Sequence, residues 1–289
     1  MFWAPELIGI LVVADEKACA QYPCARHGRG AGKTASPLFD IAGRTALVTG
    51  SSRGIGRELA RGLLEAGCTV VLNGRDETAL ARTHSELAAI AGGTVLARAF
   101  DVTDSAAVAA SVAAIEDEAG PIDILVNNAG TQVRAPLVDF TDDDWNLLLG
   151  TNLTSAFLTS REVARRMVPR GRGKIINICS VQSETVRPGI APYSATKGGL
   201  KQLTKGMCAD LGPAGIQVNG LGPGYVETEL TQALVADEEF SAWVRNRTPA
   251  GRWGRISDLI GALIFLSAPA SDFVNGQVLY VDGGMLSVL

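Results

Sequence analysis

Three residues in the second half of the chain, Ser180, Tyr193 and Lys197, have the side-chain types and the spacing of a proton-transfer site. Tyr193 and Lys197 are four residues apart in a segment that we expect to be helical, so both side chains should share one helix face. A neighbouring ammonium favours the phenolate, and we therefore expect the pKa of Tyr193 to fall toward neutral. Such a phenol can give a proton to, or take one from, an alcohol or ketone oxygen. The spacing alone is also typical of an ordinary solvated helix face.

A glycine-rich turn lies upstream of Tyr193 and Lys197 in the sequence. Its glycines follow a short apolar segment with the spacing G-x-x-x-G-x-G, which differs from the general G-x-G-x-x-G fingerprint. Glycines at such a turn let the backbone approach a pyrophosphate at a helix N-terminus. We expect a nicotinamide dinucleotide to contact the residues of this turn, namely Gly50, Ser52, Arg53, Gly54, Ile55 and Gly56.

The end of the next apolar segment should decide which dinucleotide binds. The sequence there is Asn73-Gly74-Arg75, and the first acid is Asp76. An acid at the strand end would bind the ribose 2′-hydroxyl, whereas Arg75 offers a planar donor fork for a 2′-phosphate. Arg53 can add a second positive charge. The residues favour NADP(H); NAD(H) is the alternative if Asp76 reaches the ribose or if the arginines are surface residues.

Two later segments should complete the dinucleotide site. The small residues of Asn128-Ala129-Gly130 would let the adenosine side of the cofactor lie close. Asp101 and Val102 are placed to meet the adenine, although an ordinary turn or helix cap explains them equally well.

The elements that must position these residues alternate between strand and helix from Phe39 onward. We expect strands at 44–48, 69–73, 94–100, 122–127, 174–179, 217–221 and 277–281, and helices at 54–66, 78–91, 105–119, 142–168 and 192–211. This alternation predicts a single doubly wound α/β domain of the Rossmann type over residues 38–289, with a seven-stranded parallel sheet flanked by helices. The long helix should end before Pro169, and a substrate lid is expected around 225–255.

Composition excludes several other classes of protein. The chain has 289 residues, of which 47% are hydrophobic and 19% charged, and its net charge is −4. A disordered chain would be less apolar, and a nucleic-acid-binding protein would carry a basic footprint. Because no apolar run is long enough to span a bilayer and Glu6 precedes the short apolar stretch near the N-terminus, we expect a cytoplasmic protein with no membrane partner.

Residues 1–37 differ from the rest and should form a poorly ordered extension, or else reflect a wrongly assigned start. A segment at 30–34 is similar to the end of a phosphate loop, but His27 stands where that motif needs its first glycine. Cys19, Cys24 and His27 have no companion cluster to supply a fourth ligand, so we expect no metal site. The odd number of cysteines, five, argues against a disulfide framework.

Together these motifs resemble those of the short-chain dehydrogenase/reductase family. The resemblance covers about Phe39 to Leu289 and rests on Thr49-Gly50, Gly54, Gly56, Asn127-Asn128-Ala129-Gly130, Asn152, Ser180, Tyr193-x-x-x-Lys197 and Pro223-Gly224. Each piece is weak alone, but their joint occurrence in this order is highly specific.

The resemblance implies a role for each matching residue. Tyr193 would be the general acid in ketone reduction and the base in alcohol oxidation. Lys197 would hold the nicotinamide ribose, and Ser180 would bind the substrate oxygen and steady its developing charge. Asn152 would hold a water that links Lys197 to solvent; the alternative is a polar residue that distorts its helix and is satisfied locally. Pro223-Gly224 would shape the loop over the nicotinamide.

Several loop segments are also similar to those of family members that interconvert D-gluconate and 5-dehydro-D-gluconate, at 71–75, 169–174, 177–184, 187–193 and 248–254. A sugar acid needs a cation for its carboxylate, and Arg134 and Arg187 are the candidates. Gln182 and Glu184 are candidates for its hydroxyl groups, next to Ser180 and Tyr193. Each of these is also explained as a solvated loop residue.

Two other functions are compatible with the sequence. One is an NADPH-dependent reductase of 3-oxoacyl chains or of another polyol or ketone within the family; the polar set around Arg134 argues against the apolar channel that an acyl chain needs. The other is a non-catalytic NADP-binding regulator, which would not need Ser180, Tyr193, Lys197 and Asn152 together. The resemblance further implies a homotetramer with helices 142–168 and 192–211 at a dimer contact, although their apolar residues could face only the sheet.

Overall fold

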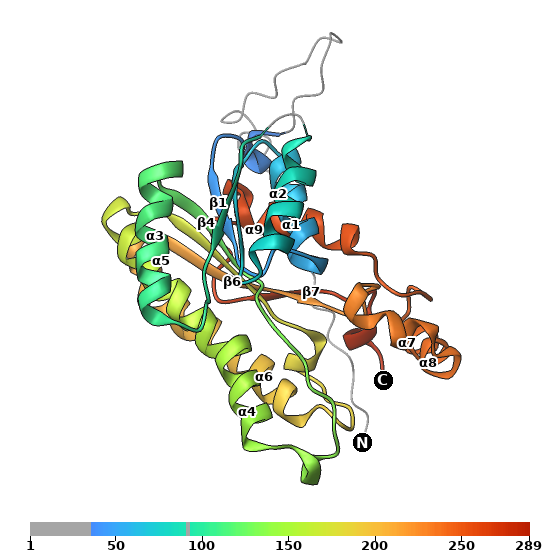
Figure 1. The fold of residues 1–289 in the computed structure, drawn as a ribbon. Coiled ribbons are helices and arrows are strands. Elements are labelled where there is room, and N and C mark those ends of the chain that lie inside the picture. The colour runs from blue at the N-terminus through green and yellow to red at the C-terminus, as the bar shows by residue number, and fades with distance from the viewer. Residues whose placement is uncertain (1–35, 91–92) are drawn as a thin grey trace, which may run out of the picture. The chain divides into compact units, whose positions relative to one another are not determined.

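The computed structural model of the protein describes residues 36–90 and 93–289. The expectations for the N-terminal extension, including Cys19, Cys24 and His27, lie outside these residues. Seven parallel strands form one sheet in the order β3-β2-β1-β4-β5-β6-β7, which confirms the predicted fold class (Figure 1). The strands are β1 (Thr45–Val48), β2 (Thr69–Gly74), β3 (Val95–Ala99), β4 (Ile122–Asn127), β5 (Gly173–Ile178), β6 (Ile216–Pro223) and β7 (Val278–Val281).

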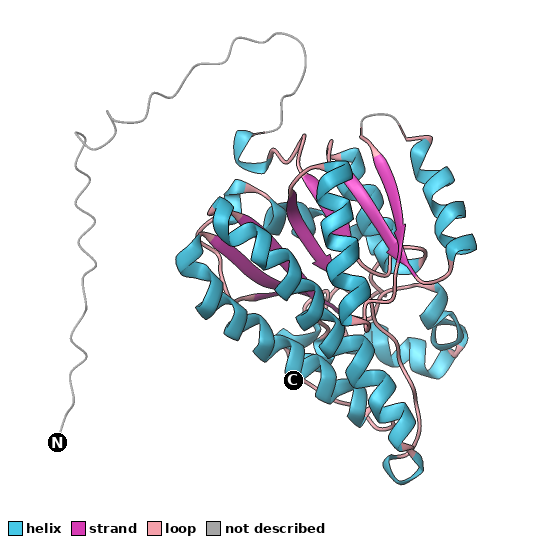
Figure 2. Ribbon diagram, turned by 60° about the vertical axis from the view of Figure 1, so that its left-hand side comes forward, coloured by secondary structure: helices cyan, strands magenta, loops and turns pink. Residues whose placement is uncertain are grey.

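Helices cover both faces of the sheet (Figure 2). On one face lie α1 (Gly54–Glu65), α2 (Glu77–Ala88) and α9 (Ile260–Ser267), and on the other lie α3 (Ser105–Ala119), α5 (Ser155–Arg170) and α6 (Ala191–Leu211). No helix among the described residues is long and apolar enough to cross a bilayer.

Side chains of the strands alternate between the two layers. Ala46 and Val48 of β1 pack toward α1 and α9, while Leu47 between them packs toward α3 and α5. All three are fully buried because a parallel sheet is covered on both sides. Burying one such leucine stabilises the fold by about 1.5–3 kcal/mol. This two-sided core holds the strand ends, and the loops that follow them, in fixed positions.

All strands run in the same direction, so the loops after β1, β2, β4, β5 and β6 meet at one edge of the sheet. The order of the strands reverses between β1 and β4, which are neighbours in the sheet. In open α/β sheets ligands bind at such a switch point, outside the carboxyl ends of the strands. The fold therefore directs the glycine turn and the loop after β4 toward a common site.

The helix predicted over 142–168 differs from the prediction in two ways. It is divided into α4 (Asp142–Leu149) and α5 by a π-helical turn at Gly150–Thr154, and α5 continues to Arg170 with Pro169 inside it. Pro169 is tolerated because it lies in the last turn, where its missing N–H removes only the hydrogen bond to the carbonyl of Arg165. Gly171, with φ of +66°, then ends the helix.

Candidate active site

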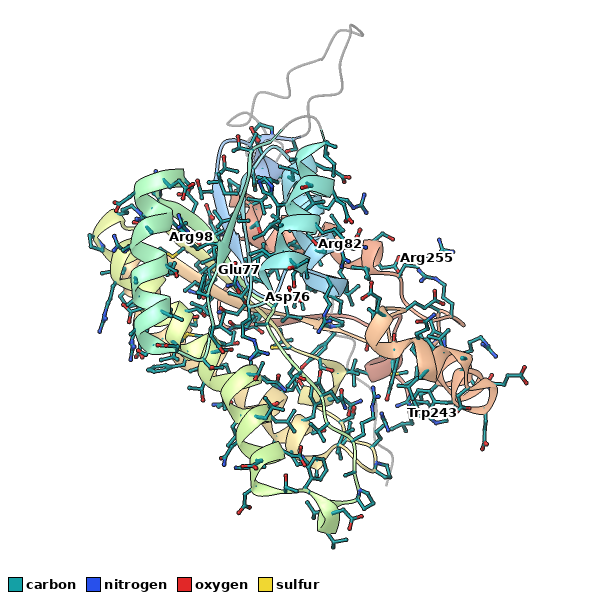
Figure 3. All side chains as sticks on the ribbon, in the orientation of Figure 1. Asp76, Glu77, Arg82, Arg98, Trp243 and Arg255 are labelled. Carbon is teal, nitrogen blue, oxygen red and sulfur yellow. The ribbon has the colours of Figure 1, made fainter. Side chains whose placement is uncertain are left out.

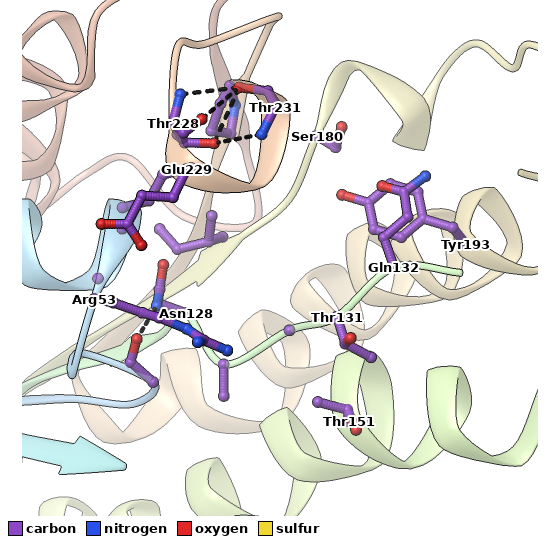
Figure 4. A pocket seen from close by; sticks show the side chains of 18 of the residues that line it. Arg53, Asn128, Thr131, Gln132, Thr151, Ser180, Tyr193, Thr228, Glu229 and Thr231 are labelled. Carbon is purple, nitrogen blue, oxygen red and sulfur yellow. Dashed lines mark hydrogen bonds between the residues drawn. The ribbon is translucent and has the colours of Figure 1, made fainter. Parts of the chain in front are cut away.

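A cavity of about 740 Å³ lies at the carboxyl edge of the sheet. Figure 4 shows part of its wall, with Ser180 and Tyr193 on one side and Arg53 and Asn128 on the other. Every residue expected to contact the cofactor lines this cavity, namely Gly50, Ser52, Arg53, Gly54, Ile55, Gly56, Asn73, Arg75, Asp101, Val102, Asn128, Ala129, Gly130, Tyr193, Lys197, Pro223 and Gly224.

The glycine turn after β1 leaves room that a side chain would fill. Gly50 has φ of +61°, and a Cβ there would lie 2.8 Å from the Cα of Ala129. At Gly56 a Cβ would lie 2.4 Å from the carbonyl oxygen of Gly50. Gly54, the first residue of α1, faces open space. The N-terminal N–H groups of α1 thus face the cavity with no Cβ in front of them, which fits the pyrophosphate of a dinucleotide.

Two asparagines fix the shape of this turn. Asn128 donates from Nδ2 to the carbonyl oxygens of Thr49, at 2.9 Å, and Gly50, at 3.0 Å. The Oδ1 of Asn73 accepts from the Gly50 N–H at 3.2 Å, and its Nδ2 donates to the Phe100 carbonyl at 3.0 Å. Both residues therefore hold the turn against β2, β3 and β4 in addition to lining the cavity.

Charged residues gather at the adenosine end of the cavity. Arg75, whose side chain is 67% exposed, has its Nη1 3.4 Å from Oδ2 of Asp101. Asp76 uses Oδ1 to cap α2 by accepting from the Ala79 N–H at 3.0 Å. One oxygen of the Asp76 carboxylate, which could have bound a ribose hydroxyl, is thus used to cap α2. The guanidinium of Arg75 remains accessible.

At the other end of the cavity, α6 carries Tyr193 and Lys197, and Ser180 follows β5. The Oγ of Ser180 accepts from the Gln182 N–H at 3.1 Å and hydrogen-bonds to the phenol of Tyr193. Lys197 is buried and donates to the carbonyl oxygen of Ile178 at 2.7 Å. The structure therefore brings the three predicted residues together, with the hydroxyl groups of Ser180 and Tyr193 at one point of the cavity.

The expected lowering of the Tyr193 pKa is not found. Burial raises the pKa of Tyr193 to about 12, and the hydrogen bond with Ser180 and the charge of Arg134 offset this only in part. The ammonium of Lys197, with its Nζ 5.8 Å from the centre of the tyrosine ring, does not outweigh this effect of burial. Burial also lowers the pKa of Lys197, to about 8. Tyr193 is thus protonated at neutral pH, and its phenol can donate the proton to a ligand.

Asn152 lies in the π-helical turn, and its side chain is buried. Its Oδ1 accepts from the Thr131 N–H at 2.7 Å, and its Nδ2 donates to the carbonyl of Thr131 at 2.9 Å and to Oγ1 of Thr196 at 3.2 Å. Both amide protons are used, so one lone pair of Oδ1 remains for the expected water. The observed bonds join the loop after β4 to the turn of α6 that carries Tyr193.

Three of the four predicted substrate side chains beyond Ser180 and Tyr193 line the cavity, namely Arg134, Gln182 and Arg187. Glu184 does not. Its Oε1 accepts from the phenol of Tyr280 at 2.7 Å and pairs with Lys201, so the carboxylate is directed away from the cavity. The prediction for Glu184 is wrong because its partners come from α6 and β7, which the local sequence cannot show.

Several wall residues lie outside the predicted cofactor and substrate contacts, although Asp76 is the alternative ribose contact and those from Tyr225 onward fall within the expected lid. They are Gly74, Asp76, Ala79, Phe100, Thr103, Thr131, Gln132, Thr151, Ile178, Cys179, Val181, Ile190, Tyr225, Val226, Thr228, Glu229, Thr231 and Leu234. Thr131 and Gln132 directly follow Gly130, and Tyr225 directly follows Gly224, so extending each motif along its loop would have found them. Figure 4 places Thr228, Glu229 and Thr231 together above the glycine turn.

The fold and the site define a class of protein. A family model described as Enoyl-(Acyl carrier protein) reductase matches residues 50–286. The chain belongs to the short-chain dehydrogenase/reductase family of oxidoreductases that act on CH–OH groups.

The chain is also similar to individual proteins of this family. The chain is 59% identical over 250 residues to gluconate 5-dehydrogenase of Gluconobacter oxydans (strain 621H), with 86% of this chain and 96% of the relative covered. It is 51% identical to 5-keto-D-gluconate 5-reductase of Escherichia coli (strain K12), with 86% and 98% covered. A crystal structure of gluconate 5-dehydrogenase from Burkholderia cenocepacia J2315 in complex with NADP and tartrate is 55% identical. It superimposes with a TM-score of 0.85 over 88% of this chain and 99% of that one.

Proposed function

We propose that the protein catalyses the reversible, NADP-dependent interconversion of D-gluconate and 5-dehydro-D-gluconate. The observation that carries the proposal is the meeting of Ser180, Tyr193 and two arginines, Arg134 and Arg187, in one cavity with a dinucleotide turn. Neither arginine forms an ion pair within the described part of the chain. Relatives whose names state this reaction, at 59% and 51% identity over most of the chain, support it.

Each residue of the site has a separate role in the proposed reaction. When bound, the nicotinamide dinucleotide supplies or accepts the hydride. Tyr193 gives its proton to the ketone oxygen during reduction, and the phenolate takes it back during oxidation. Ser180 hydrogen-bonds to the same oxygen, which stabilises the negative charge that develops there. Lys197 binds the nicotinamide ribose, and its positive charge favours the phenolate that forms.

Asn152 acts as a positioning residue in this proposal. Through Thr131 and Thr196 it keeps the loop after β4 against the part of α6 that carries Tyr193. The remaining lone pair of its Oδ1 can hold the water that links Lys197 to solvent. The segment 225–255 is proposed as the substrate lid, which is supported by Tyr225, Val226, Thr228 and Glu229 on the cavity wall.

The accessible guanidinium of Arg75 and the engagement of Asp76 at the start of α2 support a preference for NADP(H). The crystal structure of the B. cenocepacia relative, which contains NADP, supports it as well.

Replacing Arg75 by aspartate should reverse this preference. We expect the ratio of kcat/KM for NADP to kcat/KM for NAD to fall about 10- to 100-fold, because a charge-assisted hydrogen bond to phosphate is lost. The new carboxylate would also repel the 2′-phosphate. Steady-state kinetics with both dinucleotides measure the ratio, and Arg82→Asp on the exposed side of α2 is the matched change of charge outside the cavity. An unchanged ratio in Arg75→Asp would show that the cofactor is chosen elsewhere.

Arg134→Ala tests the substrate directly. We expect KM for D-gluconate to rise about 10- to 100-fold, since a hydrogen-bonded charge partner of the carboxylate is removed, while a neutral ketone is affected little. The measurement is a panel of aldonates, keto-aldonates and neutral ketones with both dinucleotides. An equal rise of KM for acid and neutral substrates would remove Arg134 from the carboxylate site, and wild-type protein that binds NADP but consumes none would favour the regulator.

We also propose a homo-oligomer, a tetramer, with the face of α4, α5 and α6 at a contact between subunits. Trp145, Leu147 and Phe157 on α4 and α5 are 42–44% exposed, which supports an apolar contact there.

A further inference from the structure

The phenol of Tyr225 lies among hydrogen-bond donors at the substrate end of the cavity. Gln182 donates from Nε2 to the Tyr225 hydroxyl at 3.4 Å, and the positively charged guanidinium of Arg187 lies near it. Burial raises the pKa of Tyr225, and the charges of Arg187 and Arg134 offset this only in part. The hydroxyl therefore keeps its proton at neutral pH, and because its oxygen is already accepting, that proton is available to a further acceptor.

The two arginines beside it have no carboxylate partner among the described residues. Among the described residues Arg134 makes no hydrogen bond or ion pair, and Arg187 reaches the carbonyl of Pro188 only at 3.4 Å. Partial burial lowers the pKa of Arg134, and the charge of Arg187, which lines the same cavity, lowers it further. Arg134 is exposed, and Arg187 and Tyr225 are partly buried, so all three donors can be reached by a ligand in the cavity. One anion would accept from all three groups, and its bonds to the arginines would be charge-assisted.

We propose that Tyr225 is a third binding group for the substrate carboxylate and sets the preference for acids over neutral substrates. The proposal rests on the proposed function, in which Arg134 and Arg187 meet a sugar acid. Tyr225 donates its phenolic proton to one carboxylate oxygen, while the arginines supply the opposite charge.

An aromatic cluster holds Tyr225 in this position. The ring lies edge-to-face against Phe240, Trp243 and Trp253, with ring centres 5.6, 5.7 and 5.8 Å away. Figure 3 shows Trp243 on α8 (Glu238–Arg247), which lies out from the sheet. The Tyr225 carbonyl accepts from the Gly254 N–H at 2.8 Å, so the backbone is fixed as well as the ring.

The same cluster also positions one of the arginines. The Cζ of Arg187 lies 5.4 Å from the centre of the Phe240 ring, in a cation–π contact. The Nε1 of Trp253 donates to Oγ of Ser241 at 2.8 Å, which ties α8 to the segment after it. Tyr225 and Arg187 are thus oriented by one packed unit of α8, and the carboxylate site is built before the substrate arrives.

Tyr225→Phe isolates the hydroxyl because it keeps the ring and its contacts. We expect kcat/KM for D-gluconate to fall about 10- to 100-fold, the range for a lost hydrogen bond to a charged group, mainly through a higher KM. D-gluconamide, the neutral amide of the same acid, should lose less than the acid does, about 2- to 12-fold, because no charged partner is present. The Kd of NADP and the melting temperature should stay at their wild-type values.

Tyr280→Phe is the matched control. It removes a phenol that donates to Glu184, outside the cavity, and should leave the kinetics with both substrates unchanged. If Tyr225→Phe leaves kcat/KM for D-gluconate unchanged, or lowers it equally for acid and amide, the proposal for Tyr225 is overturned and the proposed function stands. If the wild-type protein oxidises no aldonate with either dinucleotide, the proposed function is overturned and the proposal falls with it.

Discussion

Replacement of Tyr193 by phenylalanine should lower kcat in both directions by at least about 10³-fold, because the group that gives and takes the proton is lost together with a partner of the developing oxyanion. The ring would remain in place, so packing on α6 should be kept. The Kd of NADP, measured by isothermal titration calorimetry, should change little. Stopped-flow absorbance of NADPH with 5-dehydro-D-gluconate measures the chemical step.

Tyr280→Phe again serves as the control for loss of a phenol, since its hydroxyl binds Glu184 away from the cavity. A Tyr193→Phe variant with wild-type kcat would remove Tyr193 from the proton transfer. A variant that has lost NADP affinity as well would indicate a structural role.

Lys197→Met should lower kcat by about 10²- to 10³-fold, because a buried charge that stabilises the phenolate is removed. The KM for NADP should rise too, since the ammonium is proposed to bind the nicotinamide ribose. The pKa of Lys197 is lowered to about 8 by burial, so the ammonium is lost as the pH rises through about 8. The wild-type rate of ketone reduction should therefore decline above that pH.

Lys197→Arg separates charge from geometry, because arginine stays charged over the whole working range. Its residual reduction rate should not decline near pH 8. A decline at the same pH in Lys197→Arg would assign the titration to another group, and an unchanged kcat in Lys197→Met would contradict the role of the charge. The pH profiles of kcat for the three proteins decide between these outcomes.

The sequence predicts most accurately those elements whose beginning and end are both marked by nearby residues. Helix α3 has the predicted bounds because Asp104 caps its first turn, accepting from the Ala106 N–H at 2.8 Å, and Gly120, with φ of +78°, ends it. The glycine turn after β1 was also predictable, since Gly50 and Gly56 tolerate no side chain. In both places the local backbone requires a particular residue type, and that residue type can be recognised in the sequence.

The parts that were missed depend on residues far apart in the chain. Helix α9 has no hydrophobic period, because nearly all of its residues are apolar, and it therefore has no helical signature. The pKa of Tyr193 could not be predicted from the spacing to Lys197, because it is raised by burial in the folded chain. Glu184 is paired with Lys201 and Tyr280, and Tyr280 is 96 residues away.

Transfer of a deuterium atom from the cofactor to the substrate tests the proposed reaction and the role of Tyr193 in one experiment. Wild-type protein is incubated with 5-dehydro-D-gluconate and NADPH that carries deuterium at the reactive carbon of the nicotinamide, and the product is analysed by NMR. We expect D-gluconate with deuterium at C5, formed by the wild-type protein and not by Tyr193→Phe. Deuterium at another carbon, or binding of both compounds without any transfer, would contradict it.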